Sequence, residues 1–450
     1  MQQRERNMTE KLIAKRTKGS GREPSRRDVL AIAGAGGLAL TLGGRGAFAA
    51  GAENVLKIGF VSPRTGALAG FGETDGYVLQ LARKALAGGL EIGGKTYEVQ
   101  ILDRDTQSDP SRASQLAKSL INSDQVDLVL PVSTPETINP VADACEAAGV
   151  PCLSTVMPWE AWYFGRGGKP GAPSPFKWTY HFGFGGGEFF KAYVSLWNSM
   201  ETNKKVGVLY PNDADGNAIR QNLAPALAKA GFTIIDPGPY EDGTTDYSAQ
   251  ISLFKKEKCE IFNTFPIPPD FAAFWRQSAQ QGYTKIVKIA QIAKTGLFPA
   301  GVESLGDLGH NLASGAYWHK TFPYKSSLTG ISGVELADGY EKSSGKQWTQ
   351  QLGASMALFD AGIAALKASA NPKNKEAVAK ALGSLNTVTM AGKVDFTSGP
   401  VPNVSPGPII GTQWVKAKPG SKFKLDYVVA ENANDPNVPV ASKLVAYNQK

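Results

Sequence analysis

Residues 55–72 read VLKIGFVSPRTGALAGFG and decide the fold class of this chain. The almost continuous apolar run at 55–61 predicts a strand buried on both faces of a parallel sheet. Ser62-Pro63 ends that strand, because proline lacks the N–H that a strand ladder needs. A glycine-containing turn follows, and a helical pattern begins near Thr74. Open α/β sheets bind ligands outside the carboxyl ends of their strands, so we expect this turn to border a ligand site.

The same alternation of strand and helix continues along the chain. Further strands are predicted at 97–102, 126–132, 150–155, 206–210, 232–235, 260–265 and 285–291. An insertion at 157–175, rich in aromatic residues and glycine, separates two halves of similar rhythm, and a hairpin is predicted from 409–416 and 422–429. Strands that alternate with helices favour parallel sheets flanked by helices, so the pattern predicts two α/β lobes.

The first 49 residues have the features of an export signal. Arg26-Arg27 form a twin-arginine pattern, 31–42 is an apolar run too short to span a bilayer, and Ala47-Phe48-Ala49 is a small-x-small cleavage sequence. A GxGxxG/A match at 34–39 falls inside this apolar run and is attributed to it, not to a dinucleotide site. We expect cleavage near Ala49 and a soluble periplasmic chain, exported by the twin-arginine or the general route.

Composition argues against several functions. Ten basic and four acidic residues fall within 1–49, so most of the formal charge of +8 belongs to the leader and gives no reason to expect nucleic acid. The three histidines have no partners at metal-ligand spacing, and no nucleophile elbow or phosphate loop is present. We therefore expect no metal, no cofactor and no enzymatic activity. Cys145 and Cys152 could form one disulfide, or all three cysteines could be buried free thiols.

Five segments together resemble the leucine/isoleucine/valine-type periplasmic binding proteins, the solute receptors of branched-chain amino acid ABC importers. These segments are 57–72, 103–113, 126–140, 206–216 and the C-terminal hairpin. The resemblance implies a monomeric receptor that closes on a small molecule and delivers it to a membrane permease.

The resemblance also implies the type I periplasmic binding protein fold, with two Rossmann-like lobes of parallel sheets flanked by helices and three hinge crossings. By position, the crossings fall near 180–184, 312–316 and 392–396. Lobe 1 is then 54–181 plus 315–393, and lobe 2 is 182–314 plus 394–450. Gly185-Gly186-Gly187 follow the first crossing and are interpreted as freeing the hinge.

The family's ligand-binding positions carry over in part. Phe71 stands where the family often has an aromatic residue that caps the ligand. Ser133, Thr134 and Thr137 lie on the loop that receives a ligand carboxylate, and this loop opens a helix whose N-terminus favours an anion. Met157 lies in the segment that replaces the small residues and threonine completing this clamp in amino-acid binders.

The second half of the site departs from the family. Asp215 lies where the family's second lobe faces the ligand. The tyrosine and the acidic residue that hold the ligand ammonium fall roughly on Ile267 and Gln291. Because a buried, unpaired ammonium costs several kcal/mol, the α-amino acid clamp is interpreted as broken.

The insertion supplies the remaining candidates. Trp159 and Trp162, with Phe71, would surround the crevice with aromatic surface, so the hypothesis is an aromatic or branched apolar carboxylate. In the alternative, these aromatic residues pack beneath a lid and touch no ligand. A branched-chain amino acid, amide or urea-type binding protein and a ligand-sensing receptor module remain alternative functions.

Overall fold

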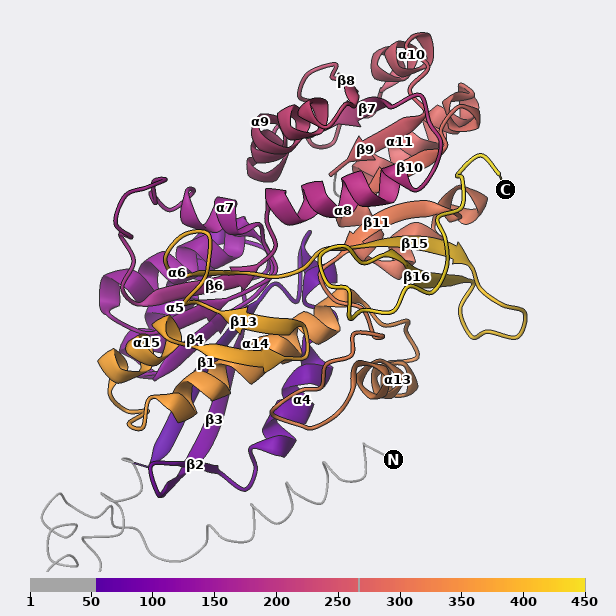
Figure 1. Ribbon diagram of the computed structural model, residues 1–450. Coiled ribbons are helices and arrows are strands. Elements are labelled where there is room, and N and C mark those ends of the chain that lie inside the picture. Colours follow the sequence, from indigo (N-terminus) through magenta and orange to yellow (C-terminus); the bar gives the residue numbers. More distant parts are fainter. Residues whose placement is uncertain (1–53, 266–267, 450) are drawn as a thin grey trace, which may run out of the picture. The chain divides into compact units, whose positions relative to one another are not determined.

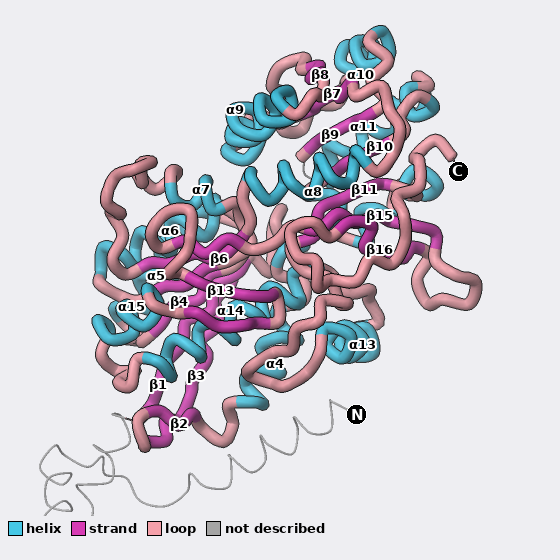
Figure 2. The backbone as a smooth tube through the Cα atoms, in the orientation of Figure 1, coloured by secondary structure: helices cyan, strands magenta, loops and turns pink. Residues whose placement is uncertain are grey.

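The computed structural model describes residues 54–265 and 268–449. The predicted export leader and Ile267 lie outside the described residues. From Asn54 onward the chain forms one compact unit. This unit contains two seven-stranded sheets and a two-stranded hairpin within its described part, and helices cover the sheets (Figure 1, Figure 2). We call each large sheet with its helices a lobe.

The sheet of lobe 1 has the strand order β14-β6-β5-β4-β1-β3-β2. Its strands are β1 (Val55–Ser62), β2 (Leu90–Ile92), β3 (Lys95–Asp105), β4 (Leu128–Pro131), β5 (Cys152–Ser154), β6 (Thr179–Gly183) and β14 (Val404–Pro406). Strand β1 lies inside the sheet and pairs in parallel with β3 and β4, so Ile58 faces both Ile101 and Leu128 in register. This confirms the doubly buried strand predicted from 55–61.

Helices cover both faces of this sheet. They are α4 (Asp75–Ala85), α5 (Pro110–Asn122), α6 (Pro135–Ala148), α14 (Gln350–Ala368) and α15 (Lys375–Gly383). Leu56, Ile58 and Phe60 pack in the large cluster with α4 and α14, whereas Val61 packs with α5 and α6. Gly59 lets α5 approach, because a Cβ there would lie 2.9 Å from a methyl carbon of Leu120.

The sheet of lobe 2 has the strand order β16-β15-β11-β10-β9-β7-β8. Its strands are β7 (Lys205–Leu209), β8 (Thr233–Ile235), β9 (Ile261–Thr264), β10 (Ile289–Ile292), β11 (Leu312–Ala316), β15 (Ile410–Lys416) and β16 (Leu425–Glu431). The C-terminal hairpin β15–β16 adds to the parallel strands in antiparallel orientation. The helices are α8 (Gly186–Asn198), α9 (Ala214–Lys229), α10 (Ser248–Lys256), α11 (Pro268–Gln280) and α12 (Pro299–Glu303).

Three smaller elements complete the unit. The insertion contains the short helix α7 (Trp159–Tyr163), and α13 (Gly333–Ser344) begins with a capping box between Ser332 and Glu335. Strands β12 (Asn386–Thr389) and β13 (Gly392–Asp395) form the separate hairpin. No helix in the described part of the chain is both long and apolar enough to cross a membrane.

The chain passes between the sheets after β6, after β11 and after β14. The third passage is at 407–409 and not at 392–396, because β14 still pairs with β6 in the sheet of lobe 1. The residues at the predicted third crossing instead form β13, which pairs locally with β12. The predicted boundary of lobe 2 at 394 therefore moves past β14. Cys145, Cys152 and Cys259 are buried free thiols in this structure.

Candidate functional site

A cavity of about 590 Å³, its open mouth included, lies between the carboxyl ends of the two sheets. Its lining from lobe 1 and the crossings is Phe71, Ser133, Thr134, Pro135, Val156, Met157, Pro158, Phe184, Tyr317 and Ile409. Its lining from lobe 2 is Phe189, Ile219, Phe265, Ala293, Lys294, Leu297 and Gly315. The cavity thus lies at the edge where open α/β sheets bind ligands.

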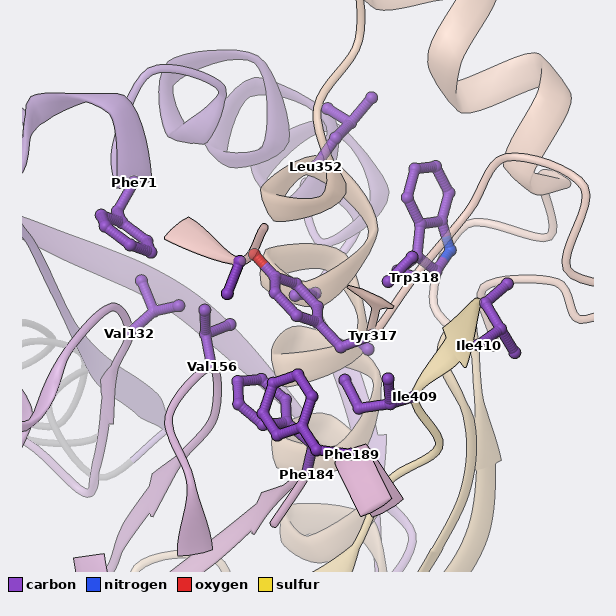
Figure 3. Packing of buried hydrophobic residues seen from close by; sticks show 14 of the residues in the cluster. Phe71, Val132, Val156, Phe184, Phe189, Tyr317, Trp318, Leu352, Ile409 and Ile410 are labelled. Atoms are coloured by element: carbon purple, nitrogen blue, oxygen red, sulfur yellow. The ribbon is translucent and has the colours of Figure 1, made fainter. Parts of the chain in front are cut away.

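All three crossings contribute to the cavity. Phe184 follows β6, Tyr317 follows β11, and Ile409 precedes β15. The rings of Phe184 and Tyr317 stack with centroids 5.3 Å apart and planes 16° apart. Figure 3 shows Phe184, Phe189 and Ile409 grouped beside Tyr317. The segments that join the lobes are therefore also part of the cavity wall.

A pair of phenylalanines joins the lobes at the mouth. Phe71, after β1, meets Phe298 of lobe 2 edge to face, with ring centroids 5.1 Å apart. Gly70 permits this approach, because a Cβ there would lie 2.8 Å from a ring carbon of Phe298. Such edge-to-face pairs contribute about 0.5–1.5 kcal/mol beyond their buried area.

The polar groups of lobe 1 lie at the start of α6. The hydroxyls of Ser133 and Thr134 are buried and have no hydrogen-bond partner among the described residues. Thr134 is the N-cap of α6, yet its side chain caps no backbone N–H. A buried polar group without a partner costs about 1–3 kcal/mol, and a helix N-terminus favours negative charge. These hydroxyls are therefore suited to an anionic group of a ligand.

Two residues of this wall have a strained backbone. Ser133 has φ of 131° and Val156 has φ of 76°. Positive φ is unusual for serine and is a clear outlier for β-branched valine. An isolated bridge between Val132 and Thr155 holds the two loops side by side. Such strain costs about 1–3 kcal/mol per residue and is found mainly at binding and catalytic sites.

A buried histidine supports this wall from behind. The imidazole Nε2 of His181 lies 3.0 Å from the carbonyl oxygen of Met157, and Nδ1 lies 2.9 Å from the hydroxyl of Ser154. A carbonyl only accepts, so Nε2–H donates to Met157 and Nδ1 accepts from Ser154. Burial lowers the pKa of His181 to about 3, so the ring is neutral. His181 is thus a positioning residue for Met157.

The two insertion tryptophans do not line the cavity, contrary to the expectation from sequence. Trp162 is fully buried, and its ring stacks on His181 with centroids 5.5 Å apart. Trp159 donates its backbone N–H to the carbonyl of Phe184 at 2.8 Å. The physical reason is that the insertion folds back as α7 onto lobe 1 and the first crossing, where the cluster of Phe176 and Tyr163 takes up its aromatic surface.

Helix α7 also changes the interpretation of the hinge glycines. Glu160 accepts a hydrogen bond at 2.8 Å from the backbone N–H of Gly186, the first residue of α8. A Cβ on Gly185 would lie 2.1 Å from the indole nitrogen of Trp159. These glycines therefore allow α7 to pack tightly against the first crossing, whereas the sequence suggested that they loosen it.

The other predicted residues are distributed as follows. Phe71, Ser133, Thr134 and Met157 line the cavity. Thr137 is buried one turn into α6 and donates to the carbonyl of Thr134 at 3.5 Å. Gln291 lies within β10 and accepts from the indole N–H of Trp197 at 3.3 Å, so it is part of the packing of lobe 2. Asp215 is in the first turn of α9.

Sequence reasoning missed much of the cavity. The missed aromatic residues are Phe184, Phe189, Phe265 and Tyr317. One signal could have found some of them, because Phe184, Phe265 and Tyr317 directly follow the strands β6, β9 and β11 at the edge where ligands bind. Phe189 is the fourth residue of α8 and carries no such signal.

Lobe 2 offers one charged side chain to the cavity. Lys294, which follows β10, forms an ion pair with Asp213 at 3.0 Å. Asp213 also caps α9 by accepting from the backbone N–H of Gly216 at 2.6 Å. None of the described residues that line the cavity carries a carboxylate. The cavity therefore supplies donors for an anion but no counter-charge for an ammonium group.

Comparison with known proteins identifies a family and several structures of similar fold. Residues 55–405 match the family model described as periplasmic binding protein. The fold is similar to the leucine-binding protein LivK of Thermotoga maritima, with 18% identity and a TM-score of 0.66 over 85% of this chain and 99% of that one. It is also similar to a solute-binding protein of Rhodopseudomonas palustris in complex with 3,4-dihydroxybenzoic acid, with 17% identity and a TM-score of 0.67 over 87% and 98%.

Two further matches extend the range of relatives. LivJ of Streptococcus pneumoniae, in complex with isoleucine, is 17% identical with a TM-score of 0.64 over 84% of this chain and 99% of that one. An uncharacterized protein of Methanocaldococcus jannaschii, MJ1266, is 24% identical over 199 residues, which are 44% of this chain. The match spans slightly less than half of that curated relative, 46% of its length. At these identities the solved structures establish the fold, not the ligand.

Proposed function

This chain belongs to the periplasmic binding protein family, and from that premise we propose that it is the receptor of an ABC importer for a small apolar carboxylate without an α-ammonium group. The receptor binds the solute between its lobes, closes on it and delivers it to a membrane permease without altering it. We place it in the periplasm, after removal of the leader near Ala49. The ligand class is aromatic or branched and apolar.

The pair of buried, unpaired hydroxyls at the start of α6 carries this proposal. Ser133 and Thr134 combine two unused donors with the positive end of a helix, in a cavity whose other walls are mostly apolar. A carboxylate that accepts both hydrogen bonds removes their desolvation cost. Each charge-assisted bond contributes about 1.5–3 kcal/mol.

The remaining lining supports an apolar ligand body. Five aromatic side chains line the cavity: Phe71, Phe184, Phe189, Phe265 and Tyr317. Burial of about 200 Å² of ligand surface against them would contribute roughly 5 kcal/mol at 25 cal/mol/Å². An α-amino acid would instead place an ammonium in a cavity whose described lining has no carboxylate. A branched-chain amino acid, the ligand named for one structural relative, is the second candidate.

The decisive experiment is a ligand screen on the mature chain. We expect benzoate, 3-phenylpropanoate and 4-methylpentanoate to raise the melting temperature, because a ligand at 100 times its Kd stabilises the folded state by about 2.7 kcal/mol. The amides of the same acids and the free amino acids are the matched controls. Calorimetry then gives the Kd of each compound that stabilises the chain. Tight binding of leucine or phenylalanine with no response to the acids would overturn the proposal.

A further inference from the structure

The lysine on the wall of lobe 2 suggests a second contact to the ligand. We propose that Lys294 donates a hydrogen bond to a neutral oxygen of the ligand, a keto or hydroxyl group, and so selects oxygenated carboxylates over both their unsubstituted parents and their amino analogues. This inference rests on the proposed function and deepens it. It adds one residue and one functional group to the ligand that the receptor selects.

The position of Lys294 places its side chain where a ligand enters. It lines the cavity, and with Phe71 it also lines an outer crevice of about 1390 Å³ between the glycine turn 67–73 and the segment 298–301. Lys294 and Phe71 therefore stand at the boundary between the crevice and the cavity. The start of α6 and Lys294 belong to different lobes, so a ligand that touches both is held from two sides.

The groups around Lys294 determine to which kind of ligand atom it can donate. Its ammonium is 3.0 Å from the Asp213 carboxylate, and both side chains are largely buried. A lysine ammonium has three donors, so this ion pair and a bond to a ligand are compatible. Burial, Asp213 and Asp270 raise the pKa of Asp242, and Lys294 lowers it, so Asp242 is a second carboxyl group near this lysine.

These charges argue for a neutral acceptor. A second carboxylate on the ligand would approach Asp213 and Asp242 and be repelled by them. A ligand ammonium has no lone pair, so it cannot accept from Lys294, and like charges repel. A keto or hydroxyl oxygen accepts the bond and brings no charge. The solved relative in complex with 3,4-dihydroxybenzoic acid binds a ligand of this chemical kind.

Matched ligand series test the inference. The first series is 3-phenylpropanoate, phenyllactate, phenylpyruvate and phenylalanine, which differ only at the α-carbon. The second series is benzoate, 4-hydroxybenzoate and 3,4-dihydroxybenzoate. We expect the oxygenated members of at least one series to bind at least tenfold tighter than the parent acid, since hydrogen bonds to charged groups are the stronger ones.

Three variants test whether that preference comes from Lys294. Lys294→Met keeps much of the side-chain length and should remove the tenfold preference, so that the oxygenated acid and its parent bind this variant with a similar Kd. Lys288→Met is the control, because Lys288 pairs with Glu260 at 3.1 Å and does not line the cavity. Asp213→Asn keeps an oxygen that can cap α9 and removes one carboxylate, so it should improve binding of the dicarboxylate phenylsuccinate.

The outcomes separate this inference from the proposed function. If the parent acids bind and oxygen makes no difference in either series, the role of Lys294 is refuted and the proposed function stands. Equal weakening of every ligand by Lys294→Met also refutes it, because a general electrostatic or structural role would act in that way. If no carboxylate of either series binds, the proposed function fails and this inference fails with it.

Discussion

The two walls of the cavity differ in whether their polar groups have partners and whether their backbone is strained. Lobe 1 presents Ser133 and Thr134 with buried, unused hydroxyls, and two of its lining residues have strained backbones. In lobe 2, none of the described residues that line the cavity has positive φ, and Lys294 already has Asp213 as its counter-ion. Buried polar groups without a partner gain most from a ligand that supplies one. Under the proposed function, the hydroxyls of lobe 1 therefore depend on the ligand for a partner, whereas the ion pair of lobe 2 exists without it.

The support of the lobe-1 wall should show the largest effect. Trp162→Ala removes a fully buried indole from the cluster behind His181 and should lower the free energy of unfolding by about 3–5 kcal/mol. Denaturant titration measures this loss. The partly buried Trp159, replaced by alanine, should cost less. If this variant kept its stability but lost ligand binding, Trp162 would instead be a ligand contact, as the sequence suggested.

The hydroxyls of lobe 1 should matter for binding and not for folding. The double variant Ser133→Ala/Thr134→Val should weaken carboxylate binding by about 2 kcal/mol per hydroxyl, while the stability of the ligand-free protein stays the same or rises. Calorimetry and thermal unfolding separate the two quantities. Thr264→Val in lobe 2 is the control, because that hydroxyl donates to the carbonyl of Leu209 at 2.5 Å. It should lower stability and spare binding.

Glycine substitutions should have opposite signs on the two walls. Ser133→Gly relieves a φ of 131° and should stabilise the ligand-free protein by about 1–2 kcal/mol. Ala218→Gly, within helix α9 of lobe 2 and next to the cavity-lining Ile219, should destabilise it by about 0.5–1 kcal/mol. Chemical unfolding of both variants measures these changes. Destabilisation by both would contradict the asymmetry of strain.

The junction between the lobes should show the smallest effect, and it depends on pH. Burial raises the pKa of Glu160 to about 7, with a contribution from Glu188. The folded protein therefore binds more protons than the unfolded chain between about pH 4.5 and 7, so the free energy of unfolding falls as pH rises through this window. Glu160→Gln should make this fall shallower, by about 1 kcal/mol for each pH unit within the window. Parallel stability profiles for the two proteins would exclude this role for Glu160.

The fold was predictable because its determinants are local. The apolar run at 55–61 and the later alternation of strands and helices predict two α/β lobes, and the structure confirms them. The position of Ser133 and Thr134 at the cavity also follows from a local feature, a strand that runs into a helix start. Such features need only neighbouring residues.

The rest of the cavity depends on contacts between distant residues. The third crossing was misplaced because the pairing of Val404 with His181 joins segments far apart in the sequence. Trp162 was assigned to the ligand because its hydrophobicity is visible in the sequence, whereas its partner His181 is not adjacent. An aromatic residue can fill a core or a ligand site equally well, and only the packing decides between them.

The placement of Phe184, Tyr317 and Ile409 on the crossings has a practical consequence for engineering. A change in the size of any of these side chains would alter both the volume available to the solute and the relative orientation of the two lobes. Redesign of the receptor for a new solute should therefore begin at Val156 and Phe265, which line the cavity but do not lie on the crossings. A fluorescent reporter attached near the joints would, conversely, respond to the shape of the bound molecule as well as to its presence.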